Sequence, residues 1–280
     1  MAPEKSPPMQ YYLRSKKRFP TVWCPGCGIG IVQGGIIRGV ERLKLSKDEV
    51  AMVSGIGCTG RMSVYVDFNT LHTTHGRALA FATGLKLARP QMKVITVMGD
   101  GDAVAIGGNH FIHAARRNIE ITAVVVNNLT YGMTGGQQSP TTPLGDIATV
   151  APYGSIDLPM DICKLAEASG ASFVARTTAY HAVEIEKLVA RAMSRKGFAV
   201  VEVMAHCPTF YGRANLMPGP VEMLNWYRDN TSAADVPGKI RRGVLVDREL
   251  PEYGEQYRLL VQKAQASKAG AKGKGGGIAG

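Results

Sequence analysis

The chain has 280 residues, 45% of them hydrophobic and 20% charged, which is enough apolar material to bury a substantial core and excludes a fibrous or disordered chain. The chain has five cysteines, an odd number, and its N-terminal segment lacks the apolar stretch of a secretion signal. Both observations argue against a disulfide framework and predict a reducing, cytoplasmic setting. Since no run of about 20 apolar residues occurs, we expect no membrane-spanning segment.

The formal net charge is +11, which raises the question of a nucleic-acid partner. The basic residues are spread along the chain and no aromatic and basic recognition module accompanies them, so we expect no nucleic-acid binding. A basic face suits an acidic protein partner, because opposite charges speed encounter within the roughly 8 Å that physiological salt leaves unscreened. A basic surface that is only solvated is the alternative.

The two ends of the chain differ from its middle. Residues 1–20 are rich in proline and basic residues and are expected to form an N-terminal extension. Residues 231–280 are expected to form a C-terminal extension that ends in a low-complexity Lys/Gly/Ala tail. One domain is predicted between them, over residues 21–230.

Helical and strand patterns alternate along this domain. In chain order they predict a helix over 28–40, a strand over 49–53, a helix over 76–87, a strand over 93–98, a helix over 103–117, a strand over 121–126, a helix over 182–193 and a strand over 198–204. Such alternation predicts an α/β fold with a doubly wound, mostly parallel sheet.

The segment from 129 to 159 lacks strong periodicity and is rich in Gly, Pro, Thr and Gln, which indicates a long loop. Since it follows a predicted strand end, we expect a mobile cover over a site, with Gly135 and Gly136 as its hinge.

Polar turns follow two consecutive predicted strands. Gly99-Asp100-Gly101-Asp102 ends the first strand, and Asn127-Asn128 ends the second. In an open parallel sheet such turns share one edge, where free backbone N–H groups and close-approaching glycines suit phosphate oxygens. Asp100 and Asn128 offer the oxygen ligands that Mg²⁺ prefers. The alternative for the first turn alone is an ordinary glycine turn.

Cysteines are expected at the same edge. Cys24 and Cys27 lie on one tight turn, while Cys58 and Cys207 follow predicted strands. Four thiols gathered there fit a tetrahedral zinc or a four-iron cluster, although the long separations match no compact zinc finger. The fifth, Cys163, lies in the amphipathic segment 160–168 and is interpreted as a small buried hydrophobe.

The histidines form no separate metal motif. His110 and His113 share a helical face without a third ligand, so packing or capping is expected. His75 is a candidate for contacting a cofactor or intermediate, with His72 three residues earlier; either histidine is alternatively a hydrogen-bonded residue at a helix start.

Taken together, the motifs resemble the β subunits of 2-oxoacid:ferredoxin oxidoreductases, most closely those acting on 2-oxoglutarate. The resemblance spans roughly residues 20–230 and rests on an ordered set of motifs: Trp23-Cys24-Pro25-Gly26-Cys27-Gly28, Gly57-Cys58, His75-Gly76-Arg77-Ala78, Gly99-Asp100-Gly101-Asp102, Ile106-Gly107-Gly108-Asn109-His110, Tyr131-Gly132-Met133-Thr134-Gly135-Gly136-Gln137 and Cys207-Pro208-Thr209.

The resemblance implies three cofactors: thiamine diphosphate, Mg²⁺ and a [4Fe-4S] cluster. It assigns the cluster to Cys24, Cys27, Cys58 and Cys207, and Mg²⁺ to Asp100, Asn128 and the carbonyl of Thr130. It also implies a set of residues lining the thiamine diphosphate: Ile56, Gly57, Cys58, Thr59, His75, Gly101, Asp102, Gly132 and Met133.

The implied reaction converts 2-oxoglutarate, coenzyme A and oxidised ferredoxin reversibly to succinyl-CoA, CO₂ and reduced ferredoxin. An α subunit would supply the carboxylate that activates the aminopyrimidine ring, so the chain alone is expected to be catalytically incomplete. Arg61 is a candidate for binding the second carboxylate of 2-oxoglutarate, because a guanidinium pairs with carboxylates in a bidentate manner. A surface arginine that contacts the partner is the alternative.

Other readings of the chemistry stay open. The same reaction on pyruvate or a branched 2-oxoacid is one, and a non-redox thiamine enzyme with structural zinc is another. A basic binding module without chemistry is a third.

Overall fold

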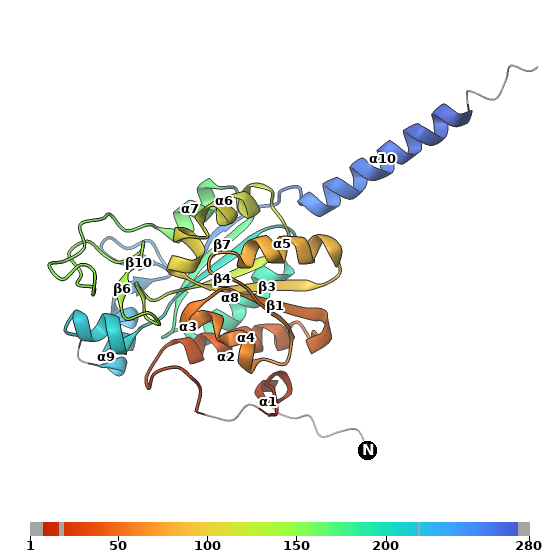
Figure 1. The fold of residues 1–280 in the computed structure, drawn as a ribbon. Helices are drawn as coiled ribbons and strands as arrows, with labels where there is room; N and C mark the ends of the chain where they lie inside the picture. Colours follow the sequence, from red (N-terminus) through yellow and green to blue (C-terminus); the bar gives the residue numbers. More distant parts are fainter. Residues whose placement is uncertain (1–7, 17–19, 218, 274–280) are drawn as a thin grey trace, which may run out of the picture.

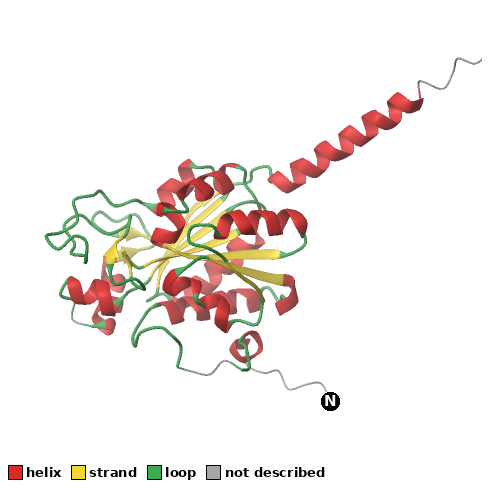
Figure 2. Cartoon of the chain, viewed as in Figure 1, coloured by secondary structure: helices red, strands yellow, loops and turns green. Residues whose placement is uncertain are grey.

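The computed structural model describes residues 8–16, 20–217 and 219–273, and it has one central sheet of seven strands (Figures 1 and 2). The strand order is β11-β7-β8-β4-β3-β1-β2, and all neighbours are parallel except β11, which is antiparallel to β7. The strands are β1 (Val50–Ser54), β2 (Asn69–His72), β3 (Lys93–Gly99), β4 (Thr122–Asn127), β7 (Phe173–Thr178), β8 (Ala199–Met204) and β11 (Gly243–Asp247). The predicted doubly wound, mostly parallel sheet is confirmed.

Helices cover both faces of the sheet (Figure 1). α2 (Ile29–Arg42) and α8 (Ala182–Ser194) pack on one face, and α5 (Ala78–Ala88), α6 (Gly108–Arg116) and α7 (Ile162–Ala168) on the other. Every residue of β1, β4 and β8 is buried, as expected for strands covered on both sides. Their continuous apolar runs are therefore why the sequence predicts them.

The glycines of α2 have a packing role. A Cβ on Gly35 would lie 2.5 Å from Ile185 Cγ2, and one on Gly39 would lie 2.9 Å from Val189 Cγ1, both on α8. Because glycine lacks a side chain, the axes of these two helices approach closely over one end of the sheet.

The predicted helix 103–117 differs from the structure. A π-helical turn over Gly101–Ala105 comes first, and α6 begins only at Gly108. A Cβ on Gly107 would lie 2.3 Å from the Asp102 carbonyl oxygen, so the chain folds tightly between the two pieces. The wide turn brings Gly101 and Asp102 to the sheet edge.

Short elements complete the chain: α1 (Pro8–Tyr12), a 3₁₀ turn (Lys47–Glu49), α3 (Gly57–Gly60), α4 (Met62–Tyr65), β5 (Thr130–Tyr131), β6 (Gln137–Gln138), a second π-helical turn (Pro208–Gly212), α9 (Pro220–Asn230), β9 (Thr231–Ser232), β10 (Ile240–Arg241) and α10 (Tyr253–Gly273). None of the described helices is both long and apolar enough to cross a membrane.

The terminal segments are partly integrated into the domain. Tyr12 is buried in the core and donates to the Leu45 carbonyl at 2.6 Å. Within the predicted extension 231–280, β11 forms an edge strand of the main sheet, so the sheet continues past residue 230. From there α10 projects away from the body (Figure 1). Residues 1–7, 17–19 and 274–280 of the two predicted extensions lie outside the described residues.

Candidate active site

The carboxyl ends of four adjacent strands, β1, β3, β4 and β8, lead into loops that meet at one edge of the sheet. A cavity opens there, lined by Ile56, Gly57, Cys58, Thr59, His75, Gly99, Asp100, Gly101, Asp102, Asn128, Thr130, Tyr131, Gly132, Met133 and Thr134. All the residues assigned by resemblance to thiamine diphosphate and Mg²⁺ lie in this lining. The structure therefore brings together residues up to 77 positions apart in sequence.

Three oxygen atoms face one another at the base of the cavity. The Asn128 amide oxygen lies 2.8 Å from the Thr130 carbonyl oxygen and 3.3 Å from Asp100 Oδ1, with no donor between them among the described residues. Two arrangements relieve this contact of acceptors. Either the amide turns its NH₂ inward and donates to both oxygens, or a cation lies between the three.

Asp100 is held from its other side. Its Oδ2 accepts hydrogen bonds from the Ser139 hydroxyl at 2.7 Å and from the Thr141 hydroxyl. Burial raises the pKa of the Asp100 carboxyl to about 6, against the lowering effect of these hydrogen bonds. The ionised carboxylate thus lacks a compensating positive charge, and its Oδ1 stays directed at the Asn128 oxygen.

Asp102 contacts His75 on the other wall of the cavity. Its Oδ1 accepts from the Gly76 N–H at 2.6 Å and pairs with His75 Nδ1. Its Oδ2 is buried and has no hydrogen-bond partner among the described residues. The carboxylate fixes the orientation of the imidazole, which leaves His75 Nε2 as the free ring nitrogen.

Tyr131 packs directly over the glycine turn. A Cβ on Gly101 would lie 2.2 Å from the Tyr131 ring, so the turn tolerates no side chain at that position. Tyr131, Thr134, Ser139 and Thr141 were not among the predicted site residues. Tyr131 stands in a motif used for the resemblance, whereas Ser139 and Thr141 carry no signal because the long loop brings them back from 40 positions away.

The thiol-bearing loops adjoin this cavity. The Trp23 indole N–H donates to the Cys58 carbonyl at 2.8 Å, and the Gly28 N–H donates to the His206 carbonyl at 3.2 Å. These bonds tie the turn of Cys24 and Cys27 to the loops that carry Cys58 and Cys207. A Cβ on Gly132, in the cavity wall, would lie 3.5 Å from Cys207 Sγ.

The four thiols also influence one another electrostatically. Burial, with smaller contributions from the neighbouring Cys207, Cys58 and Cys24, raises the pKa of Cys27 to about 12. The pKa of Cys58 is raised by burial and by Cys207 and Cys24, with Arg61 acting in the opposite sense. Without a bound cation Cys27 and Cys58 therefore hold their protons, and a positive centre is needed to bind them as thiolates.

Other predicted residues lie outside the cavity. Arg61 is exposed beside Cys58 and is not part of the lining among the described residues. His72 lies on the edge strand β2, where its Nδ1 is 2.8 Å from the Ser54 hydroxyl. His110 and His113 join no group of metal-binding side chains within the described part of the chain.

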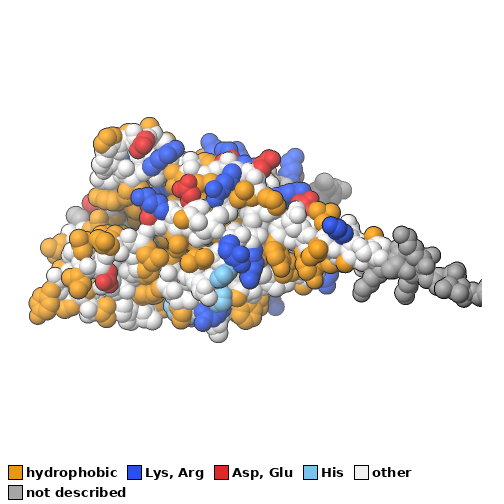
Figure 3. Space-filling view, turned by 90° about the horizontal axis from the view of Figure 1, so that it is seen from above, with side chains coloured by type: hydrophobic (Ala, Val, Ile, Leu, Met, Phe, Trp, Pro, Cys, Tyr) orange, Lys and Arg blue, Asp and Glu red, His pale blue; other side chains and the backbone are white. Residues whose placement is uncertain are grey.

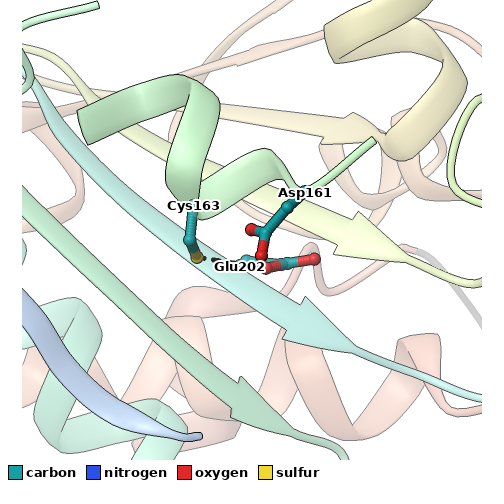
Figure 4. A group of neighbouring side chains, drawn as sticks. All are labelled: Asp161, Cys163 and Glu202. Atoms are coloured by element: carbon teal, nitrogen blue, oxygen red, sulfur yellow. Dashed lines mark hydrogen bonds between the residues drawn. The ribbon is translucent and has the colours of Figure 1, made fainter. Parts of the chain in front are cut away.

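Cys163 is buried as predicted, yet it is more than a small hydrophobe. Figure 4 shows its thiol beside Glu202 and Asp161, and Sγ donates to Glu202 Oε2 at 3.1 Å. The Arg176 guanidinium bridges both carboxylates, from Nε to Glu202 at 2.7 Å and from Nη2 to Asp161 at 2.6 Å. The guanidinium compensates much of the negative charge of Glu202 and Asp161, and its hydrogen bonds use carboxylate oxygens that a metal ion would otherwise bind.

This buried cluster is connected to the cavity. Asn127 Nδ2 donates to Glu202 Oε1 at 2.8 Å, and Asn127 Oδ1 lies 2.9 Å from the Thr141 hydroxyl that donates to Asp100. The Thr141 hydroxyl has one proton to donate, to Asp100 or to Asn127, so it is the point where the buried cluster and the Asp100 carboxylate meet.

Comparison with known proteins identifies the class first. The family described as "Thiamine pyrophosphate enzyme, C-terminal TPP binding domain" matches residues 51–203, more than half of the chain. Thiamine pyrophosphate is thiamine diphosphate, so the fold is that of a thiamine diphosphate-binding domain.

Relatives over the full length narrow the class. The chain is 52% identical to "2-oxoglutarate synthase subunit KorB" of Archaeoglobus fulgidus, over 91% of this chain and 96% of the relative. It is 45% identical to the protein of the same name from Methanocaldococcus jannaschii, over 92% and 99% respectively. A solved 2-oxoglutarate:ferredoxin oxidoreductase from Magnetococcus marinus, with 2-oxoglutarate, coenzyme A and succinyl-CoA bound, superposes with a TM-score of 0.84 at 33% identity, covering 94% of this chain and 92% of that chain. The chain belongs to the β subunits of 2-oxoacid:ferredoxin oxidoreductases.

Proposed function

We propose that the chain is the subunit of a 2-oxoglutarate:ferredoxin oxidoreductase that carries thiamine diphosphate, Mg²⁺ and a [4Fe-4S] cluster. The reaction is 2-oxoglutarate, coenzyme A and oxidised ferredoxin to succinyl-CoA, CO₂ and reduced ferredoxin, and it is reversible. The observation that carries the proposal is the meeting of an oxygen-lined pocket and four cysteines at one sheet edge. The names of the full-length relatives support the choice of 2-oxoglutarate.

The three facing oxygens suit Mg²⁺. Adjacent oxygens around an octahedral Mg²⁺, each about 2.1 Å from the ion, lie roughly 3 Å apart. The separations of 2.8 Å and 3.3 Å around the Asn128 oxygen match this spacing. Asp100, Asn128 and the Thr130 carbonyl would hold the ion. Its positive charge would compensate the buried negative charge of the Asp100 carboxylate.

The rest of the lining suits the remainder of the cofactor. Gly99 and Gly101 let the backbone approach a diphosphate closely, and the turn presents N–H groups to its oxygens. Asp102 orients His75 from Nδ1, so that His75 Nε2 can exchange a proton or hydrogen bond with a bound group. Ile56 and Met133 offer apolar contact from opposite loops.

The cysteine spacing favours a cluster over zinc. Four sulfurs bound to one zinc at about 2.3 Å would lie roughly 3.8 Å apart. In the described part of the chain, no three cysteine sulfurs lie within 4.8 Å of one another. A larger centre such as [4Fe-4S], which takes four thiolates on four irons, suits Cys24, Cys27, Cys58 and Cys207 better.

When bound, thiamine diphosphate supplies carbanion stabilisation for decarboxylation of a 2-oxoacid, and the cluster supplies a one-electron acceptor. The chain's own contribution is proximity. Cys58 lines the cofactor cavity, and Cys207 Sγ lies behind the Gly132 wall of that cavity. Two of the four cluster ligands thus border the place where the substrate would react.

A partner α subunit completes this site. The only carboxylates in the described lining are Asp100, which faces the cation position, and Asp102, which is engaged by His75 and Gly76. Asp102 Oδ2, which has no hydrogen-bond partner within the described ranges, packs against the Gly55 backbone, where a Cβ would lie 1.5 Å from it. A partner therefore has to supply the carboxylate for an aminopyrimidine ring. The net charge of +11 suits an acidic ferredoxin as acceptor.

Arg61 is the proposed contact for the second carboxylate of 2-oxoglutarate. It lies beside Cys58 at the rim and not in the cavity wall, so it would act on a substrate that extends outward. A desolvated charged hydrogen bond contributes about 1.5–3 kcal/mol, which is roughly ten- to a hundredfold in discrimination.

An anaerobic assay of the complex with its α subunit tests the proposal. We expect coenzyme A-dependent reduction of ferredoxin with 2-oxoglutarate, preferred over pyruvate and branched 2-oxoacids, and Arg61→Ala to reduce that preference about ten- to a hundredfold. A preference of the wild-type complex for pyruvate would refute the proposal that 2-oxoglutarate is the substrate. A colourless protein that contains zinc and transfers no electrons would refute the redox chemistry.

A further inference from the structure

The loop between β6 and α7 exposes an unusual number of large apolar side chains. Tyr153 is fully exposed, Ile156 is 89% exposed and Leu158 is 82% exposed. We call the exposed set the apolar platform; its members are Leu144, Ile147, Val150, Tyr153, Ile156 and Leu158. In Figure 3, hydrophobic side chains gather at the end of the molecule opposite α10, where this loop lies in Figure 1. Exposed patches of this kind mark interaction sites.

Hydrogen bonds within the loop and to a neighbouring element hold the platform together. The Gly145 N–H donates to the Ser155 carbonyl at 2.8 Å, and the Ser155 N–H donates to the Asp146 carbonyl at 2.8 Å. Asn215 fixes Ile147 from outside the loop, accepting from its N–H at 2.8 Å and donating to its carbonyl at 3.1 Å. These bonds hold the backbone of the loop in a conformation that leaves the apolar side chains exposed.

The platform continues into the wall of the cofactor cavity. The Thr149 N–H donates to the Gly136 carbonyl at 3.0 Å, and the Gly136 N–H donates to the Tyr131 carbonyl at 2.9 Å. Tyr131 lines the cavity. A protein seated on the platform would therefore also reach the rim of the cavity.

We propose that the apolar platform is the seat of the partner chain that completes the thiamine diphosphate site. The inference rests on the proposed function, because it uses the partner that the cavity requires. That partner would present an apolar face with a Lys or Arg opposite Asp157.

Charge argues for this occupant over a second copy of the chain. Between residues 140 and 160 the sequence contains two charged residues, Asp146 and Asp157, although the whole chain carries +11. Asp146 pairs with the Tyr211 hydroxyl, while the exposed Asp157 accepts from Gln138 Nε2 at 2.9 Å. Two copies meeting through this surface would bring acidic platforms together and leave both cofactor cavities without the missing carboxylate.

The test compares the same change, an exposed β-branched residue to Asp, on and off the platform in the complex co-expressed with the α subunit. Ile156→Asp should lower the affinity of the chain for the α subunit at least tenfold in sedimentation analysis. Val183→Asp, on α8 and 62% exposed, should leave that affinity unchanged. Asp157→Lys, which alters no packed side chain, should also weaken assembly. Far-UV circular dichroism and iron content of each variant should match the wild type.

Wild-type affinity for the α subunit in both Ile156→Asp and Asp157→Lys would overturn the proposal. It would also be overturned if Ile156→Asp separated a dimer of the isolated chain while leaving assembly with the α subunit intact, because the platform would then seat a second copy. Failure of the proposed function is distinct: the wild-type complex would assemble and yet bind no thiamine diphosphate or iron.

Discussion

Asp100→Asn should stabilise the metal-free chain and abolish cofactor binding. Burial raises the pKa of Asp100 from 3.8 to about 6. Because each pKa unit corresponds to about 1.36 kcal/mol, the difference of roughly 2 units corresponds to about 3 kcal/mol. The folded state holds this proton more tightly than the unfolded state. Stability of the metal-free chain therefore falls as pH rises from about 4 to about 6, and the full loss is present at pH 7.

Asparagine cannot ionise, and it keeps an oxygen for the hydroxyls of Ser139 and Thr141. We expect the free energy of unfolding of Asp100→Asn to exceed that of the wild type by up to about 3 kcal/mol at pH 7 with chelator present, and the gain to disappear near pH 4. With Mg²⁺ and thiamine diphosphate present, the wild type should have the higher free energy of unfolding, because only the wild type gains stability by binding them.

Urea unfolding followed by circular dichroism measures the first effect, and calorimetric titration with Mg²⁺ and thiamine diphosphate measures the second. Glu249→Gln makes the same carboxylate-to-amide change on a side chain that is 93% exposed, and should alter neither. Loss of stability in Asp100→Asn at pH 7 without metal, or retention of wild-type cofactor affinity, would refute the reasoning.

Three further substitutions separate the parts of the site. Gly101→Ala should weaken thiamine diphosphate binding more than tenfold, because its Cβ would lie 2.2 Å from the Tyr131 ring; unchanged affinity in a calorimetric titration would contradict this. Cys58→Ser should lose iron and visible colour while Cys163→Ser keeps both, and equal iron content in the two variants would argue against the ligand assignment. Glu252→Ala should lower stability by about 1–3 kcal/mol without changing cofactor affinity, since its carboxylate accepts from three backbone N–H groups at the base of α10; thermal unfolding checks this.

Local patterns predict four of the seven strands of the sheet, β1, β3, β4 and β8, and the polar turns that follow β3 and β4. Most of the remaining cavity lining follows from the motif resemblance. Buried parallel strands give continuous β-branched runs, and the polar residues that follow them reach a common edge once the sheet forms. Asp100 and Asn128 are recognisable for this reason. Cys58 and Cys207 are expected at that edge because each follows a predicted strand. The assignment of the cysteines and of Thr130 as ligands follows from the motif resemblance.

Other features depend on contacts that no local pattern records. Ser139 and Thr141 reach Asp100 only because the long loop folds back over the sheet edge. The strand β11 pairs with β7 from far along the chain, so a boundary at residue 230 misses it. Arg61 shares a loop with Cys58, yet its direction out of the cavity is decided by tertiary packing.

The long loop shows what composition can and cannot predict. Glycine and proline content predicts irregular backbone over 129–159, and the backbone is indeed mostly irregular. Hydrogen bonds such as those of Asn215 to Ile147 tie part of this backbone to the rest of the domain, and the mobility of the loop stays a prediction. Composition also gives no sign that this loop exposes the large apolar side chains of the platform.

The central claim is that the cysteine-bound centre and the cofactor pocket adjoin each other. Anomalous diffraction at the iron edge, from air-free crystals of the complex with thiamine diphosphate and Mg²⁺, tests this most directly. We expect a compact group of irons bound by Cys24, Cys27, Cys58 and Cys207, directly behind the Gly132 wall of the pocket. A lone zinc at these thiols, or iron bound elsewhere and remote from the pocket, would contradict it.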